Sequence, residues 1–229
     1  ISQTDRMTVP IWLTQAVANG VTVDWGDGSA VETSETVDTE IQFSHTYAET
    51  GDYVIRLGIV GNGTVTLGQH YDIDMMEGAS YGGLFGSMNE HVYANMLTKV
   101  EIGDSQIDFN AAVFAGCAQL QSITMPMALS RIGDRFAASS GVGSFTIPDT
   151  VTQIGEGAFI RSRLSSISIP KSVSTIESNA FNTTECHTIF IPDGITTIVG
   201  SIAGTNLTKL VFPSSVASIG ESENIRPIE

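Results

Sequence analysis

The chain from Leu120 to Gly220 repeats one pattern of apolar and polar positions five times. Each copy opens with a short alternating segment that ends in proline, as in Leu164-Ser-Ser-Ile-Ser-Ile-Pro170. The prolines follow one another at intervals of 22, 22, 22 and 21 residues: Pro126, Pro148, Pro170, Pro192 and Pro213. A fixed period of this length predicts a solenoid, in which each coil buries its apolar edge against its neighbours.

The alternation predicts one short strand per coil, and neighbouring strands would form a parallel sheet. In the third copy Ile167 and Ile169 should point inward, and Ser166 and Ser168 outward. Proline ends each strand because it cannot donate to the ladder. A second apolar pair follows each proline, and an aromatic residue closes most coils. We therefore expect an aromatic stack in the core, formed by Phe136, Phe159 and Phe181.

A degenerate copy of the repeat precedes the five clear ones. It runs from Leu97 to Ile102, and Gly103 replaces its proline. Leu84-Phe85 is interpreted as a degenerate first coil that caps the solenoid, since terminal repeats have an outer face that meets solvent. The fifth clear copy is incomplete, which suggests that the natural protein continues or ends differently.

The first 76 residues show the shorter period of β-strands. Alternating segments at Val21–Trp25, Ile41–Tyr47, Tyr53–Ile59 and Thr64–Leu67 are separated by turn-forming residues. Asn62-Gly63 predicts a hairpin between the last two. Short strands at this spacing are typical of a small β-sandwich. The predicted domains are thus a sandwich (1–76), a linker and cap (77–96) and a solenoid (97–229).

The first domain resembles the PKD domain, an Ig-like β-sandwich found on many extracellular proteins. The matching motifs are Val23-Asp-Trp-Gly-Asp-Gly-Ser29, His45-Thr-Tyr47 and Gly51-Asp-Tyr-Val54, in that order. The resemblance implies that Trp25 and Tyr53 are core residues and that Asp27 is a turn residue.

The repeats resemble the BspA-type leucine-rich repeat, whose consensus reads roughly Leu-x-x-Ile-x-Ile-Pro-x-x-Val-x-x-Ile-Gly-x-x-Ala-Phe. The clearest copy runs from Leu164 to Phe181. The sequence departs from this pattern at Arg135, which stands where other copies have alanine, at Cys186 in place of leucine, and at Ile202-Ala203 in place of phenylalanine. The resemblance implies a right-handed leucine-rich-repeat solenoid. It also implies a secreted or cell-surface protein of host-associated bacteria that is linked to adhesion rather than to catalysis.

The net charge of −15 limits the possible partners. Residues 1–96 carry −11 and residues 97–229 carry −4. An acidic surface repels phosphate groups, so neither nucleic acid nor anionic lipid is expected as a partner. No apolar run approaches the ~20 residues needed to span a bilayer, so this stretch is not expected to insert into a membrane. The start at Ile1, without Met, is interpreted as a processed or trimmed end.

Two groups of side chains raise the question of a metal site. Asp24, Asp27 and Asp52 could supply oxygen ligands to Ca²⁺, but short turns capped by aspartate explain them more simply. The His70–Met75 segment alternates strictly and would place one His and two Asp on one face. We interpret it as an amphipathic strand with one solvent-exposed face, because nothing in the sequence defines a coordination geometry for a metal. No metal or cofactor is therefore predicted.

The two cysteines, Cys117 and Cys186, lie about three coils apart. Three strand spacings of ~4.8 Å exceed the ~7 Å that a disulfide allows between Cα atoms. Both should be free and buried. Cys186 and His187 are neighbours on a strand, so their side chains should diverge rather than form a catalytic pair. Paired carboxylates of a glycosidase cannot be recognised by motif, but no catalytic motif is present and no catalytic residue is predicted.

The outward residues of the five predicted strands form the candidate binding face. Hydroxyl side chains dominate it, and two apolar side chains, Phe190 and Val211, follow in adjacent coils. That pair is either covered by a further coil or another chain, or it binds a ligand. The candidate binding residues are Ser122, Thr124, Ser144, Thr146, Ser166, Ser168, Thr188, Phe190, Lys209 and Val211.

The predicted function is non-enzymatic binding or adhesion at the surface of a host-associated bacterium. The expected partner is a host or matrix protein or a glycan, and the C-terminal coil could also support self-association. The alternative is an accessory module that targets or spaces a larger extracellular enzyme.

Overall fold

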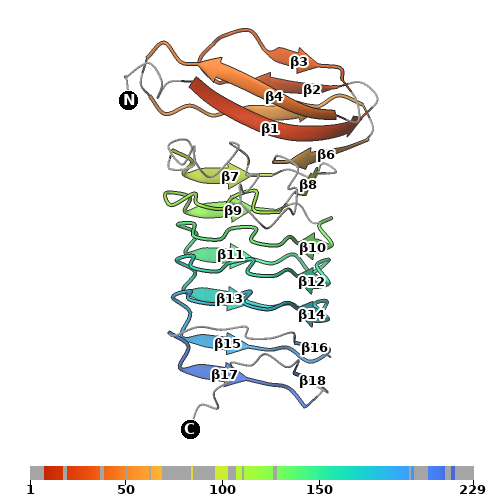
Figure 1. Ribbon diagram of the computed structural model, residues 1–229, viewed down its shortest axis with the longest axis vertical. Helices are drawn as coiled ribbons and strands as arrows, with labels where there is room; N and C mark the ends of the chain where they lie inside the picture. Colours follow the sequence, from red (N-terminus) through yellow and green to blue (C-terminus); the bar gives the residue numbers. More distant parts are fainter. Residues whose placement is uncertain are drawn as a thin grey trace, which may run out of the picture. The chain divides into compact units, whose positions relative to one another are not determined.

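The chain forms two compact units built from β-strands (Figure 1). Unit 1 comprises residues 1–93 and 105–113, and unit 2 comprises residues 94–104 and 114–229. This computed structural model describes residues 8–17, 20–36, 39–49, 51–61, 63–68, 84, 96–102, 107–109, 111–125, 128–195, 197–198, 206–214 and 218–219, and no helix occurs among them. The predicted strand at His70–Met75, Phe85 and the Ile202-Ala203 departure lie outside the described residues.

Unit 1 contains two sheets. The four-stranded sheet has the order β4-β1-β6-β8, in which β1 is antiparallel to β4 and β6, and β8 is parallel to β6. The three-stranded sheet has the order β3-β2-β5 and is antiparallel throughout. The strands are β1 (Thr8–Val17), β2 (Val21–Asp24), β3 (Glu32–Ser34), β4 (Thr39–Thr46), β5 (Arg56–Ile59), β6 (Gly63–Leu67) and β8 (Ile107–Phe109).

The alternating pattern of unit 1 buries one side of each sheet. Both sheets contribute to the apolar core, with Ile11, Leu13, Phe43, Val65 and Leu67 from one and Val21 and Val23 from the other. Pro10 lies in the half of β1 that pairs only with β4, because β6 joins β1 from Leu13 onward. Proline is tolerated there since its missing N–H leaves no ladder bond unmade.

The hairpin predicted at Asn62-Gly63 is wrong. β5 pairs with β2 in the three-stranded sheet, whereas β6 pairs with β1 in the other sheet. The chain therefore passes from one sheet to the other at this point. Pairing with β1 places Leu67 opposite Leu13 and buries both side chains, a gain that a hairpin with the short β5 would not provide.

One segment of the repeat region groups with unit 1. Residues 105–113 contain β8, which extends the four-stranded sheet beside β6. Val113 O also accepts a hydrogen bond from Leu84 N (2.9 Å), and Leu84 O accepts one from Trp12 N (2.9 Å). The compact units thus differ from the predicted boundaries over these residues.

Unit 2 is a solenoid of coils of about 22 residues. Its first column of parallel strands, on the left in Figure 1, lies where the sequence predicted. Hydrogen-bonded ladders join these strands in the pairs β7-β9, β11-β13 and β15-β17. The strands are β7 (Lys99–Glu101), β9 (Ser122–Thr124), β11 (Ser144–Thr146), β13 (Ser166–Ser168), β15 (Thr188–Phe190) and β17 (Lys209–Val211).

A second column of strands corrects the prediction of one strand per coil. Five two-residue strands form a continuous parallel sheet on the other side of the coils: β10 (Arg131–Ile132), β12 (Gln153–Ile154), β14 (Thr175–Ile176), β16 (Thr197–Ile198) and β18 (Ser218–Ile219) (Figure 1). The second apolar pair of each repeat, which follows the proline, forms these strands. Its isoleucine is buried at Ile132, Ile154, Ile176 and Ile198. The isoleucine carbonyl can accept a bond from the next coil, as when Gly155 N donates to Ile132 O (2.9 Å).

The predicted aromatic stack is present in the solenoid core. Phe136, Phe159 and Phe181 are almost fully buried, with ring centroids 6.2 Å apart for the first pair and 5.9 Å for the second. Phe114 precedes them at 5.3 Å from Phe136. Phe145 from β11 adds a further ring, 5.1 Å from Phe159. Burial of these rings is worth several kcal/mol each at ~25 cal/mol per Å².

The structure revises the alignment of the first clear coil around Arg135. Arg135 N donates to Glu156 O and Gly157 N donates to Ser178 O, so Arg135 is equivalent to Gly157 and not to alanine. Both residues have positive φ, 52° and 57°. The actual departure is Phe136-Ala137, which reverses the Ala-Phe order of the later coils. Phe136 still enters the core, because the space beside Phe145 accepts its ring (5.8 Å).

Candidate binding face on the solenoid

The outward residues of five strands in the first column define what we call the strand face. Residues one coil apart lie side by side, as Ser144 with Ser166 and Phe190 with Val211. The intervening residues of these strands, such as Phe145 and Ile189, face the core. The structure thus brings all ten candidate residues to one surface: Ser122, Thr124, Ser144, Thr146, Ser166, Ser168, Thr188, Phe190, Lys209 and Val211.

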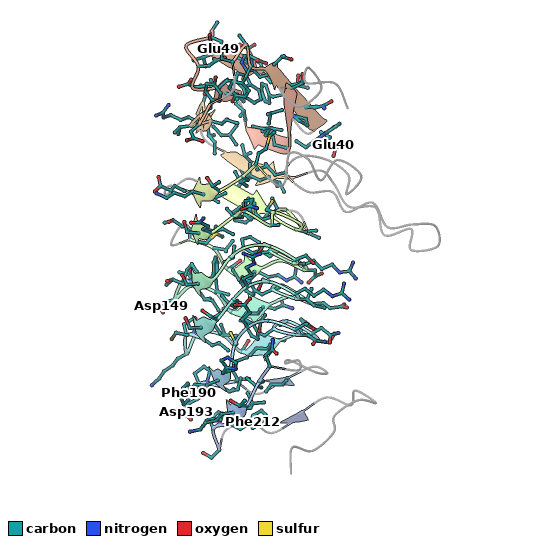
Figure 2. The ribbon with its side chains drawn as sticks, turned by 90° about the vertical axis from the view of Figure 1, so that its left-hand side faces the viewer. Glu40, Glu49, Asp149, Phe190, Asp193 and Phe212 are labelled. Atoms are coloured by element: carbon teal, nitrogen blue, oxygen red, sulfur yellow. The ribbon has the colours of Figure 1, made fainter. Side chains whose placement is uncertain are left out.

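Phe190 is the large apolar side chain of the strand face. It is 59% exposed, whereas Val211 beside it is half-buried. In Figure 2 Phe190 projects from the left-hand side of the solenoid. Its column continues the outward residues Thr124, Thr146 and Ser168 of earlier strands. An exposed aromatic ring at the end of a hydroxyl column is suited to anchor a ligand.

The sequence pattern missed the exposure of Phe212. This residue is equivalent to Ile147, Ile169 and Ile191, which are buried, but it is 42% exposed. Figure 2 labels it below Phe190, near the lower end of the solenoid. The available signal was the replacement of Ile-Pro by Phe-Pro in the last clear repeat.

The strand face also extends beyond the predicted residues. β7 continues it through Lys99 and Glu101, which pair in register with Ser122 and Thr124. Their side chains form an exposed ion pair with each other. This pair closes one end of the face with opposite charges that largely cancel.

The cysteines are free and buried as predicted. Burial raises the pKa of Cys117 to about 12 and also raises the pKa of Cys186. The Cys186 thiol donates to Leu164 O of the preceding coil (3.2 Å), whereas the exposed His187 ring donates through Nδ1 to Asn206 O (3.0 Å). Thiol and imidazole thus bond to opposite neighbouring coils, so the two side chains diverge as the strand alternation predicted.

In unit 1 the aspartates of the predicted turn cap that turn. Asp24 Oδ1 accepts from Gly26 N (2.9 Å), and Asp27 Oδ1 accepts from Ser29 N (3.0 Å). These bonds support the interpretation of both residues as turn caps. Among the described residues, no group of three or more His, Cys, Asp or Glu side chains is placed to hold a metal ion.

Asp27 also belongs to an aromatic cluster. Its Oδ2 lies 2.7 Å from His45 Nε2, and the His45 ring stacks on Trp25 with centroids 5.0 Å apart. Tyr47 donates from its hydroxyl to Trp25 O (2.9 Å) and stacks on Tyr53 (4.1 Å). Burial raises the pKa of Tyr47 to about 12, so this hydroxyl stays protonated and able to donate. The cluster fixes the Asp24–Ser29 turn against β4.

The stacked coils define unit 2 as a leucine-rich-repeat solenoid. A buried residue stands two positions before strands of the first column, at Leu120, Val142, Leu164 and Cys186. The family model of the BspA type leucine-rich repeat region matches residues 106–223 in six copies. The chain belongs to this family. Its members are typically surface or extracellular proteins of bacteria, and such repeats typically serve as non-enzymatic binding modules. No helix among the described residues is long and apolar enough to cross a membrane.

A solved structure of a leucine-rich repeat protein from Bacteroides ovatus is similar to part of the chain. The sequences are 17% identical and the TM-score is 0.43. The similarity covers 56% of this chain and 46% of the other, so this chain spans less than half of that protein. No curated protein matches the chain in sequence.

Proposed function

We propose that the chain is a non-enzymatic binding or adhesion protein, secreted or held at the cell surface of a host-associated bacterium. Membership of the BspA-type family supports this localisation and this class of activity. Binding takes place on the strand face of the solenoid, and the partner is a host or matrix protein or a glycan.

The exposure of Phe190 carries the proposal. The Phe190 side chain is 59% exposed, so it contributes little to the core. Burying its ring under a ligand would remove a large apolar area from water. Aromatic anchors tend to dominate binding energy, and the surrounding polar contacts mainly improve fit. The hydroxyls of the neighbouring strands provide those polar contacts.

Unit 1 is proposed to be a PKD-like domain that displays the solenoid. The buried Trp25, the bond from the Tyr47 hydroxyl to its carbonyl and the capped Asp27 turn support the likeness, since they coincide with the matching motifs. In this reading unit 1 is a spacer and has no ligand of its own.

The test compares wild type with Phe190→Ser on an array of glycans and matrix proteins. We expect at least one bound ligand, with affinity reduced about tenfold by Phe190→Ser, which is ~1.4 kcal/mol. Val54→Ser is the matched control, because Val54 is 62% exposed but lies in unit 1. Sedimentation shows whether the bound partner is a second copy of the chain. Equal binding by folded Phe190→Ser would show that the face is misassigned.

A further inference from the structure

Two groups of serine and threonine side chains in the solenoid differ in what their hydroxyls bond. One group joins neighbouring coils: Ser165 donates to Gly143 O (3.1 Å), Thr208 to His187 O (3.0 Å) and Thr152 to Ser130 O (3.2 Å). Ser174 and Thr150 make the same kind of bond, to Thr152 O (3.2 Å) and Leu129 O (2.7 Å). These hydroxyls stabilise the stack and are committed to it.

The second group lies on the strand face, and in the described part of the chain its hydroxyls are not bonded to neighbouring coils. Within the described residues, these seven hydroxyls make no side-chain hydrogen bond. Each hydroxyl therefore keeps one donor and two acceptor sites for a molecule outside the chain. The residues are Ser122, Thr124, Ser144, Thr146, Ser166, Ser168 and Thr188.

The sheet arranges these free hydroxyls on a regular grid. Neighbouring parallel strands lie about 4.8 Å apart, and residues two apart on a strand are separated by about 6.6 Å. Ser144 and Thr146 of β11 pair in register with Ser166 and Ser168 of β13, so the grid has two columns along the solenoid axis. A matching ligand would offer hydrogen-bonding groups at regular intervals along an extended backbone.

The charge of the strand face limits the classes of ligand that it can bind. The chain carries −15, yet the outward residues of β9, β11, β13 and β15 are uncharged. The charged side chains of the face lie in its end strands, Lys209 in β17 and the Lys99–Glu101 pair in β7. The exposed residues that follow the strand-ending prolines alternate in sign: Asp149, Lys171 and Asp193. A polyanion finds no cluster of cations on this face, and the net negative charge repels it. A neutral ligand meets no such penalty.

Together with Phe190, these features point to one class of ligand. We propose that the strand face binds a neutral, extended polysaccharide that lies along the solenoid axis. Its hydroxyls exchange hydrogen bonds with the serine and threonine columns, and the apolar face of one sugar ring packs on Phe190, which pairs with Val211 in the next coil. This inference rests on the proposed function, since it names the ligand class of the same face.

The test is affinity electrophoresis of the full chain in native gels. The gels contain soluble neutral polysaccharides (β-glucan, xylan, mannan or dextran) or the polyanions heparin and alginate. We expect retardation by at least one neutral polysaccharide and by neither polyanion. Retardation should be nearly independent of salt, because screening weakens only charge interactions. Phe190→Ser should weaken binding about tenfold, which is ~1.4 kcal/mol.

Two matched double variants separate the free hydroxyls from the committed ones. Thr146→Val with Ser168→Ala removes two free hydroxyls from the face and should weaken retardation several-fold. Thr152→Val with Ser174→Ala removes two hydroxyls that join coils and should leave retardation unchanged in protein that thermal unfolding shows to be folded.

The outcomes also distinguish this inference from the proposed function. Retardation by none of the neutral polysaccharides overturns the polysaccharide assignment. If a matrix protein is then bound by wild type and lost in Phe190→Ser, the strand face remains the binding site. If a neutral polysaccharide retards wild type and both face variants equally, the assignment of the face fails as well.

Discussion

Thr183 and Gly116 adopt the same left-handed backbone conformation at equivalent positions of their coils, with φ of 59° and 74°. Ser139 and Arg161 occupy this position in the coils between them, with φ of 54° and 57°. Glycine takes this conformation without steric cost, whereas a β-branched residue is strained in it. The strain is therefore greatest at Thr183.

We predict that Thr183→Gly stabilises the solenoid. Relief of the left-handed strain gains ~1–2 kcal/mol, and the greater freedom of glycine in the unfolded chain offsets ~0.4–1 kcal/mol of it. The free energy of unfolding, from chemical denaturation, should rise by ~0.5–1 kcal/mol. Thr146→Gly in the extended strand β11 is the control and should lower it. Equal destabilisation by the two variants would contradict the assigned strain.

Phe159→Ala should be among the most destabilising single changes in unit 2. The Phe159 ring lies between Phe136 and Phe181 and also contacts Phe145, so its removal leaves a cavity within the aromatic stack. Emptying such a site costs ~3–5 kcal/mol. Denaturant titration provides the measurement. Phe190→Ala should change stability by much less, because Phe190 is exposed; comparable losses from both would place the aromatic column outside the core.

Much of the solenoid was predictable because its repeat encodes burial at every coil. The strand positions, the inward isoleucines and the aromatic stack follow from alternation and period alone. The second strand column was missed, because two-residue strands are too short to show alternation. The place of Arg135 was also misjudged. Aligning the coils on their phenylalanines hid the reversed Phe136-Ala137 order, whereas the backbone follows the plain 22-residue period.

In unit 1 the turn-forming residues predicted strand pairing less well than the repeat pattern did in the solenoid. Asn62-Gly63 favours a hairpin, yet the partner of β6 is β1, which is distant in sequence. Long-range burial of Val65 and Leu67 decides this pairing, and a single sequence does not reveal it. The exposure of Phe212 is likewise not predicted by the local pattern, since its position in the repeat predicts an inward side chain.

The two cysteines should titrate as free thiols. Under denaturing, non-reducing conditions a thiol reagent should find about two thiols per chain, because both residues are free and lie on different coils. In the folded protein at pH 8 the reaction should be slow, since burial raises the pKa of both thiols. Absence of thiols in the denatured chain, without a dimer on a gel, would contradict the coil register.

Asp27 links the stability of unit 1 to pH. A side-chain hydrogen bond from Ser29, the backbone N–H of Ser29 and the bond to His45 hold the pKa of this carboxyl well below its ordinary value of 3.8. The ionised form is thus favoured by folding. Its contribution is complete above pH 3.8 and is lost as pH falls toward the lowered pKa.

Asp27→Asn should therefore destabilise unit 1 at neutral pH, with a difference from wild type that shrinks below pH ~4. Fluorescence of Trp12 and Trp25 follows the unfolding, because both tryptophans of the chain belong to unit 1. Ser29→Ala keeps the carboxylate but removes the largest cause of the shift, so it should produce part of the same effect. A difference that stays constant from pH 7 to ~2.5 would show that the Asp27 carboxylate contributes through packing rather than through its charge.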